Sequence, residues 1–424
     1  MLTIRYIREH RDEVVQRLAV KHFAEAENAI AQLIDLDDRR RAAQQQLDAC
    51  LAEQNATAKA IGQLMASGRT EEANAAKQQT ADLKERSKRL AAELDELEQV
   101  QKQHLMQVPN LPHASVPLGR TAADNVVVRQ GGTVPALRPD ALPHWELAKR
   151  HDIIDFELGV KLTGAGFPVY KGKGAKLQRA LINFFLDENV AAGYREVMPP
   201  HMVNQDSAYG TGQLPDKEGQ MYHVPLDGFY LIPTAEVPVT NIFRDVVLPA
   251  AQLPVRLTAY TPCFRREAGS YGKDVRGLNR LHQFDKVEIV QVQHPDRSYA
   301  ALDEMVDHVE SILQKLELPY RIVRLCGGDM SFTSALTYDF EVYSAAQERW
   351  LEVSSVSNFE SYQANRMMLR FKEDGDKRTQ LAHTLNGSSL ALPRVLAALL
   401  ENNQTPEGIR IPEVLRPFCG FDTI

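Results

Sequence analysis

The spacing of apolar residues divides the chain into a long helical segment and a mixed segment. Between residues 25 and 105, apolar or small residues recur at alternating steps of three and four, and no proline interrupts them. This heptad spacing predicts two long antiparallel helices that meet along a seam. The first helix contributes Ile30, Leu33, Leu47, Leu51, Ala58, Ile61 and Met65, and the second contributes Ala76, Thr80, Leu83, Ser87, Leu90, Leu94 and Leu97.

A short turn at residues 67–69 separates the two predicted helices. Gly68 can adopt the left-handed conformation that ends a helix, and Thr70 can cap the next helix, whose first turn is acidic. We therefore expect a helical hairpin arm from about residue 27 to 104, roughly 50 Å long. Its seam is thin, so the arm needs a supporting body at its base. The polar residues at core positions are Asp37, Arg40 and Gln44.

The surface of the hairpin leaves its role open. Basic residues on both helices favour a polyanionic partner, whereas the acids beside them nearly balance the charge and are typical of a solvated face. Heptad spacing is also typical of a dimerisation coiled coil. A short amphipathic helix, predicted between Ile4 and Leu18, would pack at the base of the arm. The basic residues are Arg39, Arg40, Arg41, Lys84, Arg86, Lys88 and Arg89.

Three prolines within nine residues, the last of them Pro117, mark a linker after the helical segment. We therefore expect an N-terminal helical domain at 1–107, a linker at 108–120 and a second domain at 121–424. The apolar runs of the second domain predict an α+β fold, with a large, mainly antiparallel sheet flanked by helices. The predicted strands are 195–198, 229–232, 255–260, 284–292, 320–325, 337–342 and 351–354, and the predicted helices are 177–190, 297–316 and 389–402.

Composition narrows the class of protein. The formal net charge of −7 over 424 residues argues against a basic surface for indiscriminate nucleic-acid binding, but it permits a local basic stripe. No apolar run reaches the ~18 residues of a membrane span, and early acidic residues argue against a transit peptide, so we expect a cytoplasmic location. The cysteines are far apart, so we expect reduced packing residues, without disulfides or zinc. They are Cys50, Cys263, Cys326 and Cys419.

The richest candidate chemistry lies between Phe264 and Glu288. This stretch combines arginines, acids, glycines and an aromatic ring between two predicted strands, and it begins with the segment Phe264–Gly269. Arginines beside a glycine-rich turn are available for bidentate phosphate contacts. Residues 172–176 lack the spacing of a Walker loop, and the chain has neither a dinucleotide-binding fingerprint nor a hydrolase elbow. If the chain binds a nucleotide, the arginine-rich stretch must bind it.

Three segments in order resemble the three signature motifs of class II aminoacyl-tRNA synthetases. They are Gly193–Pro199, Phe264–Glu288 and Leu385–Arg394. Four further segments narrow the resemblance to seryl-tRNA synthetases of the bacterial type, and the likeness covers essentially the whole chain. These segments are Thr211–Pro215, Leu231–Pro238, Glu352–Ser355 and His383–Ser388.

The resemblance implies a reaction and its partners. ATP and L-serine would give seryl-adenylate, and serine would then pass to the 3′ end of tRNA(Ser), with tRNA(Sec) as a further expected substrate. It also implies Mg²⁺ bound with ATP, a homodimer formed through the first motif, and a hairpin that binds tRNA. Two other hypotheses are a related ligase that loads an amino acid onto a carrier protein, and a catalytically silent tRNA-binding scaffold.

The resemblance also assigns the site residues. Arg265 would hold the α-phosphate, Glu267 would read the adenine amino group, and Phe284 and Arg394 would cover the adenine faces or the γ-phosphate. Glu352 and Ser355 would hold Mg²⁺. The implied ATP site is Arg265, Arg266, Glu267, Arg280, Leu281, Phe284, Glu352, Val353, Ser354, Ser355 and Arg394, and the implied serine site is Thr234, Ala235, Glu236, Glu288, Asn386 and Ser388.

The chain departs from the family pattern at three positions. Ser389 stands where many members have a second glycine, and Pro393 directly precedes Arg394. Gly166 stands where the family often has an arginine. None of these changes removes a residue that the chemistry needs.

Overall fold

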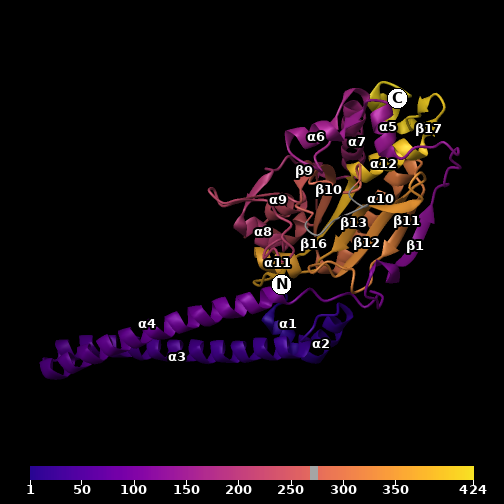
Figure 1. Cartoon of the computed structure of the whole chain (residues 1–424). Coiled ribbons are helices and arrows are strands. Elements are labelled where there is room, and N and C mark those ends of the chain that lie inside the picture. Colours follow the sequence, from indigo (N-terminus) through magenta and orange to yellow (C-terminus); the bar gives the residue numbers. More distant parts are fainter. Residues whose placement is uncertain (268–275) are drawn as a thin grey trace. The chain divides into compact units, whose positions relative to one another are not determined.

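The computed structural model describes residues 1–267 and 276–424, so Ala268 and Gly269 of the arginine-rich stretch lie outside the described residues. The chain divides into two compact units. We call residues 1–19 and 23–109 the helical unit, and residues 20–22 and 110–424 the sheet unit. Figure 1 draws the elements of both units along the chain.

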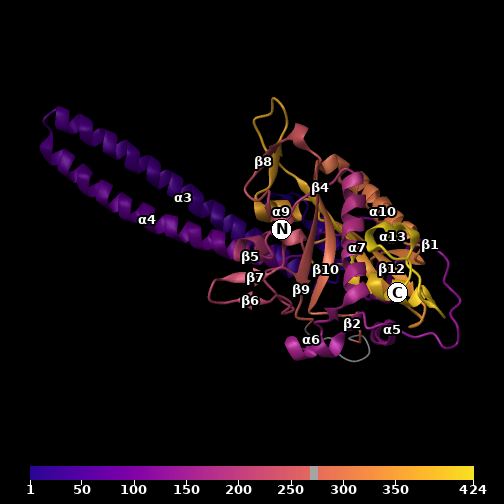
Figure 2. The same cartoon turned by 90° about the horizontal axis from the view of Figure 1, so that it is seen from above.

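The helical unit is dominated by the predicted hairpin. Helices α3 (Ala26–Ala66) and α4 (Thr70–Gln107) run side by side in antiparallel directions (Figures 1 and 2). Gly68 has the expected left-handed conformation, with φ at +74°. Thr70 is the first helical residue, however, and Arg69 takes the cap position that we predicted for Thr70. The single short helix predicted near the start is two helices, α1 (Ile4–Glu9) and α2 (Arg11–Val20).

The predicted seam is confirmed on α4 and wrong on the distal half of α3. Leu83 and Leu90 pack against Cys50, and Leu97 packs against Leu36. Leu51, Ala58 and Met65, which we placed in the seam, are exposed. The inner positions there include Cys50, Thr57 and Leu64, so the heptad spacing continues and these positions lie one residue before the predicted ones.

An eight-stranded sheet forms the frame of the sheet unit. Each neighbouring pair of its strands is antiparallel except β4 and β9, which confirms the predicted mainly antiparallel sheet. In spatial order its strands are β1 (Val126–Gly131), β11 (Tyr320–Arg324), β12 (Leu336–Ser344), β13 (Arg349–Asn358), β16 (His383–Ala391), β10 (Gln283–Gln293), β9 (Val255–Phe264) and β4 (Arg195–Glu196).

Three helices pack on this sheet around the main apolar core. They are α7 (Gly172–Ala191), α10 (Ser298–Lys315) and α12 (Leu392–Asn402), and α7 and α10 lie beside the sheet in Figure 2. Residues 172–176 therefore form the first turn of a helix. The predicted helix at 389–402 begins too early, because Ser389, Leu390 and Ala391 continue β16. Pro393 lies in the first turn of α12, where proline is tolerated.

The remaining elements surround this frame. No helix in the described ranges is long and apolar enough to cross a membrane. The smaller sheets and helices are β2 (Ile154–Asp155), β3 (Val169–Tyr170), β5 (Met202–Asn204), β6 (His223–Val224), β7 (Phe229–Leu231), β8 (Val247–Pro249), β14 (Arg370–Lys372), β15 (Gln380–Leu381), β17 (Gln404–Thr405), β18 (Gly408–Ile409), α5 (His144–Arg150), α6 (Phe156–Leu162), α8 (Gln205–Thr211), α9 (Glu236–Asn241), α11 (Tyr362–Met367) and α13 (Arg416–Cys419).

Candidate active site

Strand register brings two of the predicted serine-site residues together. Glu288 on β10 lies directly opposite Ser388 on β16, and the Ser388 hydroxyl donates to a Glu288 carboxylate oxygen at 3.5 Å. Opposite residues on antiparallel strands have their side chains on the same face, which is why residues 100 positions apart can meet. Both side chains are buried.

A buried lysine, which the sequence did not single out, completes this cluster. Lys286 Nζ lies 2.8 Å from Glu288 Oε2 and donates to the Thr234 hydroxyl at 2.8 Å. Lys286 and Glu288 are two residues apart on β10, so their side chains share a face of the strand. The lysine therefore ties the predicted Thr234 to Glu288.

Glu236 is the second buried carboxyl group of the cluster. Gln363 on α11 donates to Glu236 Oε1 at 2.7 Å. Burial, followed by repulsion from Glu288, raises the pKa of Glu236 to about 7. A hydrogen bond from the Asn386 amide opposes this rise, although the buried amide nitrogen does not reach ordinary hydrogen-bond geometry. Buried amides normally make full hydrogen bonds, so this weakly engaged donor is available to a ligand.

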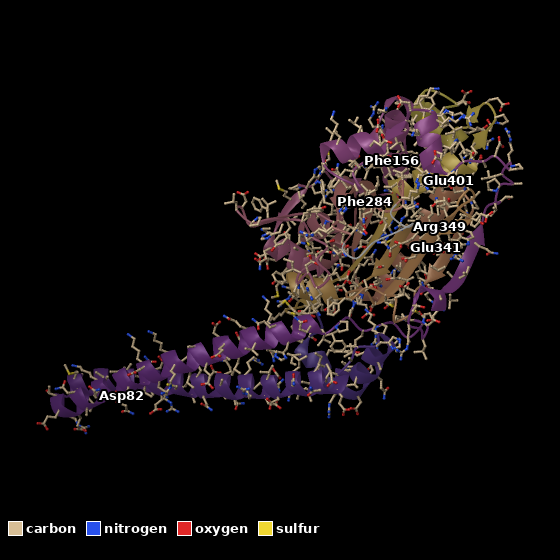
Figure 3. All side chains as sticks on the ribbon, in the orientation of Figure 1. Asp82, Phe156, Phe284, Glu341, Arg349 and Glu401 are labelled. Carbon is tan, nitrogen blue, oxygen red and sulfur yellow. The ribbon has the colours of Figure 1, made fainter. Side chains whose placement is uncertain are left out.

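The first arginine of the second motif leaves the end of β9 beside this cluster. Arg265 Nε donates to the carbonyl oxygen of Pro233 at 3.3 Å, and Pro233 directly precedes Thr234. The Arg265 guanidinium lies 5.3 Å from the centre of the Phe284 ring, within cation–π range. Figure 3 labels Phe284 on its strand in the sheet unit. The predicted nucleotide site and the predicted serine site thus meet at Pro233.

Two further pairs hold the described ends of the second motif. Arg280 donates to Glu267 at 2.8 Å. The guanidinium of Arg266 lies 5.8 Å from the centre of the Tyr222 ring. Glu267 has a positive φ of +48°, which is uncommon for a residue other than glycine and aims its side chain back toward Arg280.

The arginine of the third motif is anchored by two carbonyl groups. Arg394 Nε donates to the Asn279 carbonyl at 2.9 Å, and its Nη1 donates to the Glu352 carbonyl at 2.8 Å. A Glu352 carboxylate oxygen lies 3.7 Å from the same Nη1. Arg394 therefore connects the end of the second motif to β13.

A β-bulge places Glu352 and Ser355 on one face. Residues three apart on a regular strand point to opposite faces. The pairing of β12 with β13 skips Val353, so the extra residue restores Glu352 and Ser355 to the same side. Asp339, which no sequence motif singled out, lies opposite Ser355. Burial, and then repulsion from Glu352, raise the pKa of Asp339 well above its ordinary value.

Several predicted residues are packed rather than open. The side chains of Leu281 and Val353 belong to the main core, and Ala235 packs in a smaller apolar cluster, so only their backbone groups can face a ligand. Ser354 is buried and donates to the Ser388 carbonyl.

The departures from the family pattern are accommodated. Gly166 has a φ of +82°, and a Cβ there would lie 2.4 Å from the His282 ring. Ser389 is buried and donates to Asn189 at 2.7 Å.

The four cysteines are free and buried, as predicted.

The basic residues of the arm fall into two groups. Arg40 and Arg41 contact the buried carboxylate of Asp37, at 3.0 and 2.8 Å, so they support the hairpin itself. The side chains of the remaining predicted residues are exposed. They are Arg39, Lys84, Arg86, Lys88 and Arg89.

Comparisons with known proteins identify the family. A family model described as the seryl-tRNA synthetase N-terminal domain matches residues 1–112, and one described as the tRNA synthetase class II core domain (G, H, P, S and T) matches residues 222–403. A serine–tRNA ligase of Salinibacter ruber is 51% identical, covering 100% of this chain and 99% of that protein. One of Chlorobium luteolum is 48% identical with the same coverage.

A solved structure agrees with these sequences. The crystal structure of seryl-tRNA synthetase from Pyrococcus horikoshii, complexed with ATP, has a TM-score of 0.93 and 32% identity, and the match covers 100% of this chain and 99% of that one. The present chain therefore belongs to the seryl-tRNA synthetase family, the serine–tRNA ligases with a class II catalytic core.

Proposed function

We propose that the cluster around Pro233 and Thr234 is where serine and ATP meet in the ligase reaction of this family. The observation that carries the proposal is the Arg265–Pro233 hydrogen bond. This hydrogen bond fixes the Arg265 guanidinium next to Thr234, whose hydroxyl group accepts a hydrogen bond from Lys286. An amino acid held at Thr234 would present its carboxylate to a phosphate held at Arg265.

The charges of the cluster match those of a free amino acid. Glu236 and Glu288 supply two carboxyl groups, and Lys286 balances one of them. The remaining negative charge attracts the serine ammonium group. Ser388 and Asn386 offer hydrogen-bonding groups to a short side chain with a hydroxyl. A site with such groups rejects alanine, which leaves them unpaired, by a factor of up to ~10⁴.

The proposed nucleotide site is complementary to an adenylate. Phe284 offers a ring for one face of adenine, and Glu267 offers an acceptor for its amino group. Arg265 would stabilise the charge that develops on the α-phosphate as the serine carboxylate attacks and pyrophosphate leaves. No general base is required, because the attacking carboxylate is already ionised.

Magnesium fits the hard oxygen atoms of Glu352 and Ser355, which the bulge at Val353 places on one face. Within the described residues, no group of three or more His, Cys, Asp or Glu could hold a metal ion, so phosphate oxygens would supply the remaining ligands. Bound Mg²⁺ would neutralise charge on the leaving pyrophosphate.

We propose that the exposed basic residues of the arm bind tRNA(Ser) and tRNA(Sec) through phosphate contacts. The functional division then follows the expected one, with an arm domain at 1–107, a linker at 108–120 and a catalytic domain at 121–424. A homodimer and a cytoplasmic location complete the proposal. A carrier-protein ligase is not favoured, because residues 1–112 match the seryl-tRNA synthetase N-terminal domain.

Serine-dependent exchange of labelled pyrophosphate into ATP tests the reaction. The wild-type chain should exchange at saturating serine and not with alanine. Arg265→Ala should abolish exchange, while Arg256→Ala is a matched control, because Arg256 lies near the start of β9, the strand that Arg265 follows, and pairs with Glu304. Absence of exchange in the wild type, or equal activity of the two variants, contradicts the proposal.

A further inference from the structure

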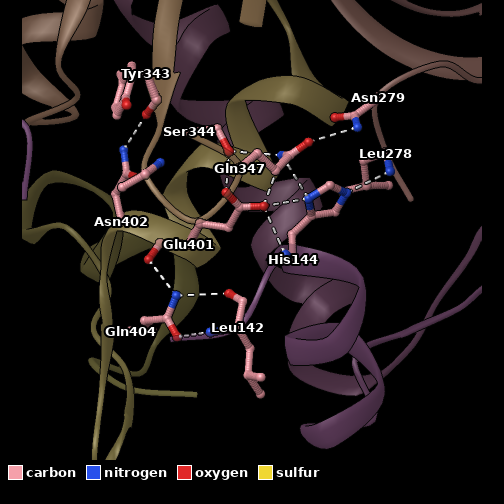
Figure 4. Close-up of polar contacts among 11 residues, drawn as sticks. Leu142, His144, Leu278, Asn279, Tyr343, Ser344, Gln347, Glu401, Asn402 and Gln404 are labelled. Carbon is pink, nitrogen blue, oxygen red and sulfur yellow. Dashed lines mark hydrogen bonds and ion pairs between the residues drawn. The ribbon is translucent and has the colours of Figure 1, made fainter. Parts of the chain in front are cut away.

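A buried polar network connects α5 with α12 in the sheet unit (Figure 4). His144, the first residue of α5, and Glu401, near the end of α12, are both 0% exposed. His144 Nδ1 lies 2.7 Å from Glu401 Oε1, and the His144 backbone N–H donates to the same oxygen at 2.9 Å. The reaction proposed above assigns no role to either residue.

The hydrogen bonds fix the state of the imidazole ring. The backbone N–H of Leu278 donates to His144 Nε2 at 2.8 Å. Because a backbone amide can only donate, Nε2 carries no proton, and Nδ1–H donates to Glu401. Burial alone would raise the pKa of Glu401, but hydrogen bonds led by that from His144 lower it below its ordinary value. His144 is thus a neutral bridge between a carboxylate on α12 and the backbone of residue 278.

The start of α5 also contacts residues 276 and 277 of the second motif. Gly277 has a φ of +66°, and a Cβ there would lie 2.2 Å from His144 Nε2, so only glycine can approach the ring this closely. The guanidinium of Arg276 lies 4.6 Å from the centre of the Trp145 ring and 3.4 Å from Glu146. Three successive residues of α5 therefore hold three successive residues of the motif.

The network continues to the arginine of the third motif. Gln347 donates to Glu401 at 3.0 Å, and Asn279 donates to Gln347 at 2.9 Å. The Asn279 carbonyl then accepts from Arg394 Nε at 2.9 Å. Arg394 and Glu401 lie at opposite ends of α12, so the network closes a ring around residues 278–279.

We propose that His144 is a positioning residue for nucleotide binding, which it serves by fixing residues 276–280 and, through Asn279, the guanidinium of Arg394. The inference rests on the proposed function, since that assigns Arg280 and Arg394 to the nucleotide. Displacement of a binding group by about 1 Å can cost ~100-fold in rate, so an anchor behind the arginines has a measurable effect.

The experiment compares four variants with the wild-type chain. His144→Ala removes the bridge, and His144→Gln keeps an amide that can accept from Leu278 and donate to Glu401. Gln347→Ala, at a half-buried position, removes the link between Glu401 and Asn279 together with the contacts of Gln347 with Ser344 and His144, and it leaves the hydrogen bonds of His144 with Glu401 and Leu278 in place. Val309→Ala, in the buried face of α10, is a control for lost stability alone. The readouts are KM for ATP and for serine in pyrophosphate exchange, calorimetric affinity for adenylyl-imidodiphosphate, and Tm.

His144→Ala and Gln347→Ala should each weaken nucleotide affinity by ~10-fold or more and leave the KM for serine within about 2-fold, while His144→Gln recovers most of the loss. The inference would be overturned if His144→Ala and Gln347→Ala both fold and bind the nucleotide as tightly as the wild type. It would also be overturned if Val309→Ala shows the same losses for ATP and for serine. If His144→Ala does not fold, Gln347→Ala decides. If the wild type binds nucleotide without serine-dependent exchange, the proposed function fails, and calorimetry still decides the role of His144.

Discussion

Replacing Glu236 with glutamine should stabilise the sheet unit at neutral pH and impair the enzyme. Glu236 is buried, lies beside the Glu288 carboxylate, and has a pKa raised from 4.5 to about 7. A rise of this size corresponds to roughly 3 kcal/mol, because each unit is worth about 1.4 kcal/mol. Glutamine keeps an oxygen to accept from Gln363 and removes the ionisable group.

Because folding raises the pKa of Glu236, the stability difference between the wild type and Glu236→Gln depends on pH. Below pH 4.5 the carboxyl is protonated in the folded and unfolded chains, so the wild type and Glu236→Gln should be equally stable. Between pH 4.5 and 7 only the unfolded chain ionises, so the wild type loses stability as the pH rises. Above pH 7 the full difference of roughly 3 kcal/mol should separate the two proteins.

Thermal melting from pH 4.5 to 8.5 measures this difference. We expect the Tm of Glu236→Gln to exceed that of the wild type by roughly 5 °C at pH 8, with a gap below about 1 °C at pH 4.5. The variant should also raise the KM for serine, because the ammonium loses one of two carboxylates. Glu407→Gln, at an exposed carboxyl, is the control and should leave both quantities unchanged. A Tm gap that does not depend on pH would refute the electrostatic reasoning.

Two further predictions concern the arm. Deletion of residues Ala31–Gln101 should leave pyrophosphate exchange intact and abolish tRNA charging, and equal loss of both activities would mean that the arm supports the catalytic core instead. Asp37→Ala leaves Arg8, Arg40 and Arg41 without their shared carboxylate, so it should destabilise the hairpin by about 2 kcal/mol, measured by far-ultraviolet circular dichroism. Although burial opposes it, hydrogen bonds from Arg40 and Gln101 lower the pKa of Asp37. This stabilisation is therefore complete above the unfolded pKa and is lost as pH falls through the folded pKa, so the two proteins should converge in acid.

Local periodicity predicted the elements of the fold well. The hairpin tip at Gly68 and the strands around 255–264 and 283–293 follow from apolar spacing and turn chemistry. The seam at Leu51 was wrong because heptad spacing fits Cys50 as well as Leu51, and it is Cys50, one residue earlier, that is buried. The helix start at Ser389 was wrong because a buried strand and a buried helix have the same apolar composition.

The candidate site was predictable only in part. The family resemblance pointed to Glu288 and Ser388, but their direct opposition depends on strand register, which distant parts of the chain determine. The bulge at Val353 has no local signal, so the shared face of Glu352 and Ser355 required the structure. Nothing in the sequence distinguishes Lys286 from other strand residues, and its buried ion pair with Glu288 is visible only in the structure.

A crystal structure with a non-hydrolysable seryl-adenylate analogue shows directly where serine and the nucleotide bind. We expect the serine ammonium and hydroxyl within hydrogen-bonding distance of the cluster formed by Thr234, Glu236, Glu288 and Ser388. We also expect adenine against Phe284 and the linkage oxygens against Arg265. An analogue bound with its seryl group away from Glu236 and Glu288, or with Arg265 still on the Pro233 carbonyl and not on the linkage, would contradict the proposed function.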